Sequence, residues 1–231
     1  MMSADPGSVP LVAIIDSGLS PDLTGRAVAA RGFAAVSDGV EDAAVTADAV
    51  GHGSAVARLV TEAAPAARLL NAQIFHDRAA TTPVVVAAAL RWAVARRADI
   101  AVLSLGMRSD REALREACAE AVAAGMILVA SAPARGLPVY PAAYPGVLRV
   151  SGDARCAAGE VSWFGDGIAE YGTCSLLVHG AAPTGGASFA AARLAGLLAA
   201  ALWSGDLEPG QDPHAYLRAR ARFTGRERRL G

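Results

Sequence analysis

Three residues of the kinds that carry out nucleophilic catalysis, Asp16, His52 and Ser188, each lie within two residues of a glycine. A serine hydroxyl attacks a carbonyl when a neutral imidazole takes its proton, and a carboxylate then fixes the imidazole tautomer and stabilises the cation that forms. Glycine leaves such side chains room to approach one another closely. The three residues therefore predict acyl-transfer chemistry if the fold brings them together.

Ser188 lies just before a long apolar segment, residues 190–203, that is typical of a helix. The first turn of a helix has unpaired N–H groups and the positive end of the dipole, so it stabilises an oxyanion. The same pattern is also typical of an ordinary helix start with an early polar residue. Ser188 is thus a candidate nucleophile only in combination with the other two residues.

Asp16 and His52 lie where a strand ends and where a helix begins. Residues 9–15 form a short apolar, β-branched run typical of a buried parallel strand, and Asp16 follows it. An aspartate there is also common as a turn residue. His52 precedes an apolar helix expected at residues 55–63. Because open α/β sheets bind ligands at the carboxyl ends of their strands, we expect Asp16 at the reactive edge of the sheet.

Strand and helix patterns alternate through the middle of the chain, which predicts an α/β fold with a mainly parallel central sheet flanked by helices. Further strands are expected at residues 67–75, 100–105, 126–131, 146–151 and 160–164, and helices at residues 82–97 and 110–124. Residues 19–48 are expected to be a surface connection with at most a couple of short strands near residues 28–36.

A chain of 231 residues is long enough to bury one sizeable core. We expect a single domain over residues 1–231, with its core at about residues 9–204 and an arginine-rich helix or tail over residues 205–231. The formal net charge of −1 gives no reason to propose nucleic acid or a membrane surface as a partner. The tail arginines are interpreted as a solvated helix face and frayed end. The oligomeric state is left open.

The cysteines have neither paired nor metal-ligand spacing, and their number is odd. Residues 1–10 lack a basic n-region and an apolar h-region, and no uninterrupted apolar run is long enough to span a membrane. No acidic cluster indicates a strong calcium site. We therefore expect a cytoplasmic protein that uses no metal and no cofactor.

Three ordered motifs resemble the active-site motifs of the subtilisin-like serine proteases. They are Asp-Ser-Gly at residues 16–18, Gly-His-Gly-Ser at residues 51–54 and Gly-Ala-Ser-Phe-Ala at residues 186–190. The resemblance runs over about residues 9–203 and implies a three-layer subtilisin-like fold with Asp16, His52 and Ser188 as the catalytic triad. By the same resemblance, the segment of Ser104, Leu105 and Gly106 pairs with an extended peptide substrate.

The sequence departs from this family around the expected oxyanion hole. The family has an asparagine after the strand that corresponds to residues 126–131, whereas Pro133 falls at or next to that position here. In subtilisin, loss of this asparagine costs about 10²–10³-fold in turnover. Ala187 replaces a threonine beside the nucleophile, and Ala192 replaces a proline. Pro133, Arg135 and Ala187 therefore mark a non-standard oxyanion region, in which Arg135 could supply a charged donor.

These observations predict a small, intracellular-type serine endopeptidase, slowed by its oxyanion hole. We expect it to cut or transacylate a peptide, for example a dedicated modified-peptide precursor, and the segment before Asp16 is too short for the family's propeptide. The alternative is a catalytically impaired relative that binds peptides or acts as a scaffold. An α/β-hydrolase is disfavoured, because the serine lacks a G-x-S-x-G elbow and the order is Asp, His, Ser.

Overall fold

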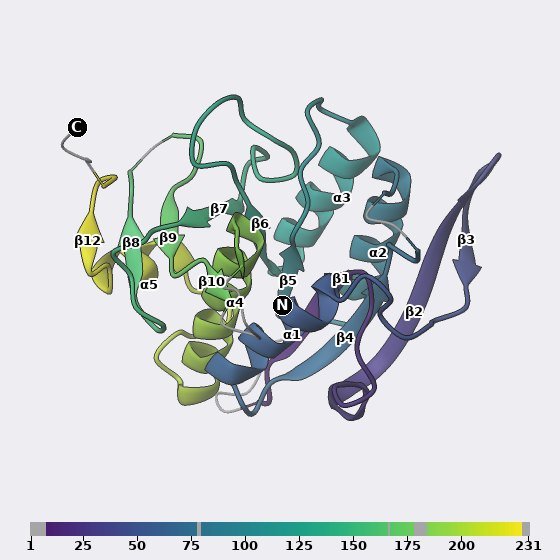
Figure 1. Ribbon diagram of the computed structural model, residues 1–231, viewed down its shortest axis with the longest axis horizontal. Coiled ribbons are helices and arrows are strands. Elements are labelled where there is room, and N and C mark those ends of the chain that lie inside the picture. The colour runs from purple at the N-terminus through teal and green to yellow at the C-terminus, as the bar shows by residue number, and fades with distance from the viewer. Residues whose placement is uncertain (1–7, 78–79, 166, 178–183, 228–231) are drawn as a thin grey trace.

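The computed structural model describes residues 8–77, 80–165, 167–177 and 184–227. Its centre is a sheet of ten described strands in the order β12-β8-β9-β7-β6-β5-β1-β4-β2-β3 (Figure 1). These strands are β1 (Leu11–Asp16), β2 (Ala27–Val36), β3 (Gly39–Ala43), β4 (Arg68–Gln73), β5 (Ile100–Leu103), β6 (Ile127–Ser131), β7 (Val147–Gly152), β8 (Val161–Trp163), β9 (Tyr171–Thr173) and β12 (Phe223–Thr224). A separate antiparallel pair joins β10 (Leu176–Leu177) to β11 (Thr184–Gly185).

The middle of the sheet is parallel and buried on both faces. Strand β1 pairs in parallel with β4 on one side and with β5 on the other, so that Ile15 lies opposite both Ala72 and Leu103. The apolar residues of β1 between its ends are fully buried, as expected for a strand covered by helices on both faces. This register brings the carboxyl ends of β1, β4 and β5 to the same edge, where Asp16 lies.

Helices cover both faces of the sheet and complete three layers. The helices are α1 (His52–Ala63), α2 (Pro83–Ala95), α3 (Glu112–Ala123), α4 (Ala187–Ser204) and α5 (Pro213–Ala219), with a 3-10 turn at Thr24–Arg26. One core lies between the sheet and the pair α2 and α3, and a second lies between the sheet and the pair α1 and α4 (Figure 1). The predicted three-layer α/β architecture with a mainly parallel sheet is confirmed.

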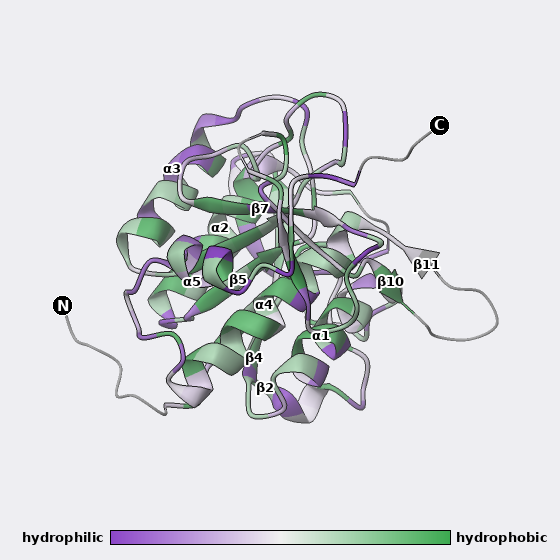
Figure 2. Cartoon of the chain, turned by 90° about the vertical axis from the view of Figure 1, so that its left-hand side faces the viewer, coloured by the Kyte–Doolittle hydropathy of each residue, from purple (hydrophilic) through white to green (hydrophobic). Residues whose placement is uncertain are grey.

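Helix α4 is the central helix of the second core. By length and composition alone it is long and apolar enough to cross a membrane. It was not counted as such a run from the sequence, because Arg193 interrupts its apolar residues. It packs instead on α1 and on the strands, and half of it is buried. Figure 2 shows this apolar helix in the interior, with polar residues on outer helix faces and loops. Its apolar character therefore serves the core.

Residues 19–48 were expected to be a surface connection with at most a couple of short strands near residues 28–36; a strand does lie there, but it is ten residues long and belongs to the main sheet. Strands β2 and β3 form an antiparallel hairpin that closes one edge of the sheet. Most of the side chains of β2 are exposed or half-exposed, so the segment lacks the continuous apolar run by which the central strands were found. At the opposite edge, β12 pairs with β8, although this part of the tail was expected to fray. Arg228 and Arg229 lie outside the described residues.

Candidate active site

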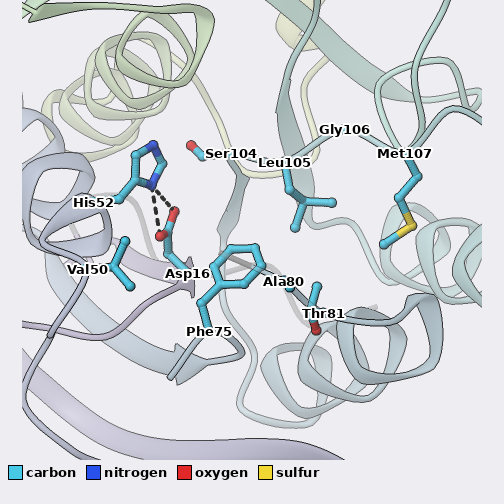
Figure 3. A pocket seen from close by; sticks show the side chains of 10 residues that line it. All are labelled: Asp16, Val50, His52, Phe75, Ala80, Thr81, Ser104, Leu105, Gly106 and Met107. Atoms are coloured by element: carbon cyan, nitrogen blue, oxygen red, sulfur yellow. Dashed lines mark hydrogen bonds and ion pairs between the residues drawn. The ribbon is translucent and has the colours of Figure 1, made fainter. Parts of the chain in front are cut away.

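A cavity of about 330 Å³ opens where the carboxyl ends of β1 and β5 meet the start of α1 (Figure 3). It is lined by Asp16, Val50, His52, Phe75, Ala80, Thr81, Ser104, Leu105, Gly106 and Met107. The cavity therefore combines two of the three predicted catalytic residues with the whole predicted substrate segment. Figure 3 shows the side chains of Leu105 and Met107 on the side of the cavity away from His52.

Asp16 and His52 are in direct contact. The Asp16 side chain is buried, and His52 Nδ1 lies 2.9 Å from each of its carboxylate oxygens (Figure 3). The Ser17 amide donates a further 2.8 Å hydrogen bond to Asp16 Oδ1. Because the carboxylate accepts the Nδ1 proton, the neutral ring has its lone pair on Nε2. This is the tautomer in which an imidazole acts as a general base toward a serine.

The carboxylate also controls the protonation of the ring. The hydrogen bond to Asp16 is the largest influence and raises the pKa of His52 above its ordinary value of 6.5, against the opposing effect of burial. The negative charges of Asp16 and Asp48 act in the same direction. A general base in this position is therefore neutral only at a higher pH than an isolated histidine.

The start of α1 is pressed against the end of β1. Gly53 N donates to Ser17 Oγ at 2.9 Å, and a Cβ at Gly53 would lie 2.4 Å from the Gly18 carbonyl oxygen. Only glycine permits this approach, which explains the glycine at position 53. The close contact sets the position of His52, the first residue of α1, relative to Asp16.

Asp48 is a site residue that the sequence analysis missed. Its Oδ2 accepts hydrogen bonds from Ser54 N at 2.8 Å and Ser54 Oγ at 2.6 Å, and its Oδ1 accepts one from Gly51 N at 2.7 Å. Burial alone would raise the pKa of Asp48, but these bonds outweigh it and the pKa is lowered. The sequence contains no clear signal for it, because Asp48 lies four residues before α1, whose N-cap is Gly51.

Ser188 lies in the first turn of α4, close to the cavity. Its Oγ donates a 3.5 Å hydrogen bond to the Ser104 carbonyl, and Ser104 Oγ donates one of the same length to the Ser188 carbonyl. The next residue, Phe189, stacks on the His52 ring with 5.9 Å between ring centroids. The structure therefore brings Ser188 beside Ser104, which lines the cavity together with His52. In the described part of the chain the Ser188 hydroxyl bonds to Ser104 and not to the imidazole.

The predicted oxyanion region has free backbone donors but no aligned side-chain donor. The amides of Ala187 and Ser188 have no acceptor among the described residues, as expected in the first turn of a helix. Pro133, which follows β6, has no N–H to donate. Arg135 lines a second cavity of about 220 Å³ together with Asp153. The structure thus assigns the Arg135 side chain to that cavity and not to the one beside His52.

The segment of Ser104, Leu105 and Gly106 continues from β5 beyond the point where pairing with β6 stops. The last paired residue is Leu103, two residues before the end of the strand expected at residues 100–105. Pairing resumes at Met107, which exchanges two backbone hydrogen bonds with Tyr140. Between these points, the backbone groups of Leu105 and Gly106 have no partner within the described residues. An extended chain can therefore pair with this edge.

The family model Peptidase S8, described as the subtilase family, matches residues 7–206. The chain is 34% identical over 163 residues to the subtilisin-like protease het-Q2 of Podospora anserina. This match covers 60% of this chain and 43% of that protein. It is 33% identical over 154 residues to the minor extracellular protease Epr of Bacillus subtilis strain 168, with 61% and 23% covered. The chain therefore spans less than half the length of these curated relatives. Among solved structures, a lanthipeptide protease matches with a TM-score of 0.68 at 18% identity, over 90% of this chain and 78% of that one.

Proposed function

The chain belongs to the subtilase family, and from this premise we propose that it is a serine peptidase with Asp16, His52 and Ser188 as its catalytic triad. The observation that carries the proposal is the contact of His52 Nδ1 with both oxygens of the buried Asp16, each at 2.9 Å. A histidine held in this way has Nε2 available to accept a proton from a nucleophile.

The reaction begins when the Ser188 side chain turns from the Ser104 carbonyl toward His52. Such a change is common on substrate binding, because catalytic hydrogen bonds are often long before the substrate is present. Ser188 Oγ forms a bond to the peptide carbonyl carbon as His52 takes its proton, and the Ser188 amide stabilises the oxyanion. The C–N bond then breaks while His52 returns the proton to the leaving nitrogen. Water, activated by the same histidine, hydrolyses the ester and regenerates Ser188.

The proposed substrate is an extended peptide that pairs with Leu105 and Gly106. The unpaired backbone of these residues supports strand addition, and the apolar side chains of Phe75 and Met107 in the adjacent cavity support an apolar substrate residue near the cut. We propose a dedicated precursor peptide cut at one place, in the cytoplasm, over general digestion. Mass spectrometry of the products of a peptide library tests the proposed selectivity. We expect cleavage next to apolar residues, and cleavage at sites without regard to apolar residues contradicts the proposal.

The catalytic assignment is tested with a fluorophosphonate probe, which reacts with activated serines. We expect covalent labelling of the wild-type protein at Ser188, no labelling of Ser188→Ala, and labelling of His52→Ala reduced by several orders of magnitude. Circular dichroism of each variant checks that it is folded. Labelling that persists in Ser188→Ala contradicts the assignment.

A peptide-binding protein without activity is the second candidate. It is favoured by the hydrogen bond of Ser188 Oγ to Ser104 and by the absence of an asparagine in residues 131–136. A folded wild-type protein that binds library peptides but does not react with the probe would establish this alternative. If the probe does react, the products separate two enzymes: a linear product indicates hydrolysis, and a cyclic one indicates resolution of the ester by the peptide's own amine.

A further inference from the structure

Phe189, the residue after the proposed nucleophile, contacts the proposed base. It lies in the first turn of α4, where its amide donates a 3.1 Å hydrogen bond to the Gly186 carbonyl. Its ring centroid is 5.9 Å from that of His52, and the two ring planes differ by 29°. The rings are therefore stacked and not edge-on, at a separation within the range of favourable aromatic pairs.

An aromatic side chain is an exception in this helix. Only 5% of the residues of the chain are Phe, Trp or Tyr. Apart from Trp203 near the far end of α4, the other residues of the helix are Ala, Leu, Gly, Ser and one Arg. Phe189 is half-buried and packs against the second core. The core of α4 is thus built from small and aliphatic residues, and the aromatic ring at its start has a partner in His52.

Phe189 contacts the imidazole from outside the cavity. His52 and Asp16 line the cavity, whereas Phe189 does not, so a substrate in the cavity and the Phe189 ring can both lie against His52. Asp16 holds the imidazole at one edge, through Nδ1. A hydrogen bond tolerates deviations of about 30° from linearity, so this contact fixes the tautomer but restrains tilting of the ring only weakly. Contact with a ring face restrains the tilt directly.

The stacked ring also acts on the charge that develops during the reaction. His52 becomes a cation as it takes the Ser188 proton, and a cation within about 6 Å of an aromatic centroid is attracted to the ring face. The neutral imidazole lacks this charge, so the attraction is larger in the transition state than before it. Only interactions that strengthen in this way accelerate the chemical step. Because 5.9 Å is near the limit, the expected gain is about two- to fivefold.

We propose that Phe189 is a positioning residue for His52: its ring holds the plane of the imidazole and stabilises the imidazolium that forms when Ser188 attacks. The inference rests on the proposed function, in which His52 is the base. Phe189 acts through His52 and not on the reacting atoms. The charged groups that act on His52 are the carboxylates of Asp16 and Asp48, and the variants that test the proposal leave both in place.

The effect on rate is tested with Phe189→Leu, which keeps an apolar side chain but removes the aromatic face, and with Phe189→Tyr, which keeps the face. Phe223→Leu, in β12 at the edge of the sheet, is the matched control, since the Arg155 guanidinium lies 5.0 Å from the Phe223 ring centre. We expect the maximal rate of fluorophosphonate labelling at Ser188 to fall at least about threefold in Phe189→Leu, with half-saturation unchanged, and to stay within about twofold of wild type in the other two variants. A smaller fall in Phe189→Leu, or an equal fall in Phe223→Leu, would overturn the proposal.

A titration that does not depend on catalysis separates this inference from the proposed function. NMR of the histidine ring protons gives the pKa of His52, whose signal is assigned by its loss in His52→Gln. Leucine shields the imidazole from water much as phenylalanine does but cannot favour its charged form, so we expect the pKa of His52 to be lower by about 0.5 in Phe189→Leu and unchanged in Phe189→Tyr. An equal or higher pKa in Phe189→Leu overturns the inference even when Ser188 is labelled. A wild-type protein that is not labelled defeats the proposed function, and with it any role of Phe189 in the reaction.

Discussion

The two halves of the candidate site are built in different ways. The acid–base half, formed by Asp16, Asp48 and His52, is held by hydrogen bonds of 2.6–2.9 Å. The nucleophile half, formed by Ser104 and Ser188, is joined within the described residues by two 3.5 Å bonds between the two serines. Bonds of that length between hydroxyl and carbonyl groups are weak.

This difference indicates which half is ready for the reaction and which half must adjust. The imidazole is already oriented and its tautomer is fixed, so substrate binding has little left to order there. In the proposed reaction, Ser188 must still exchange its weak bond to Ser104 for one to His52. Substitutions in the first half should therefore act on the base, whereas substitutions in the second half should act on the tetrahedral intermediate.

The largest effect is expected for Asp16→Asn. The amide cannot accept the Nδ1 proton in the same way, so the ring loses the required tautomer and the turnover or labelling rate falls about 10⁴-fold. Labelling kinetics measure the loss. The control is Asp22→Asn, which changes an exposed carboxylate paired with Arg58. If the labelling rate of Asp16→Asn falls by less than about tenfold, the acid–base half is not the oriented part of the site.

The next largest effect is expected for Gly53→Ala, which places a methyl group against the Gly18 carbonyl. We expect the free energy of unfolding to fall by about 1–3 kcal/mol and His52 to be displaced from Asp16, as for other overpacked sites. Denaturant titration and the labelling rate measure the two effects. Gly25→Ala is the control, since a Cβ there meets nothing within 4 Å. Equal stability of the two variants would show that the contact of α1 with β1 is adaptable.

A smaller effect is expected for Asp48→Asn. In the wild type, the labelling rate should rise with pH as His52 loses its proton, with an apparent pKa above the ordinary 6.5, because Asp16 and Asp48 raise the pKa of His52. Loss of the Asp48 charge should lower this apparent pKa and move the profile to lower pH. Weaker capping of α1 should also cost about 1 kcal/mol of stability. Asp42→Asn, in the hairpin of β2 and β3, is the control. If the pH profile of Asp48→Asn is the same as that of the wild type, Asp48 does not influence the pKa of His52.

The smallest effect is expected for Ser104→Ala. The variant loses the 3.5 Å bond from Ser104 Oγ to Ser188, but the Ser104 carbonyl that accepts from Ser188 Oγ remains. Because a bond of this length contributes little, the labelling rate should change by less than about threefold, or roughly 0.6 kcal/mol. A loss of tenfold or more would mean that the nucleophile half is as tightly organised as the acid–base half.

Much of the fold could be predicted because its central strands and helices are strongly apolar. The predicted strand ending at Asp16 and the predicted helix after Ser188 both lie where the sequence placed them, to within a few residues. The subtilisin-like fold implied by the motifs is confirmed by the solved structures. The length of β2 was underestimated, and β3 and the short β9 were missed, because mostly exposed strands and strands of three residues carry too little pattern.

The site was predictable in its residue types but not in its contacts. The motifs correctly indicated that Asp16 and His52 meet, and the approach of Gly53 to the Gly18 carbonyl is what allows it. They could not indicate the rotamer of Ser188, which depends on Ser104, a residue 84 positions away in the chain.

The crossing of α1 and α4 links the base and the nucleophile at a distance from both. His52 begins α1 and Ser188 lies in the first turn of α4, while further along the two helices touch where Gly196 meets Val60 and Ala63. A Cβ at Gly196 would lie 2.7 Å from Ala63 Cβ, so any larger residue must push the helices apart. A larger residue at position 196 would therefore shift α4 relative to α1, and with it the position of Ser188 relative to His52. The separation of these two side chains, and so the reaction rate, can be changed at Gly196 without altering either of them.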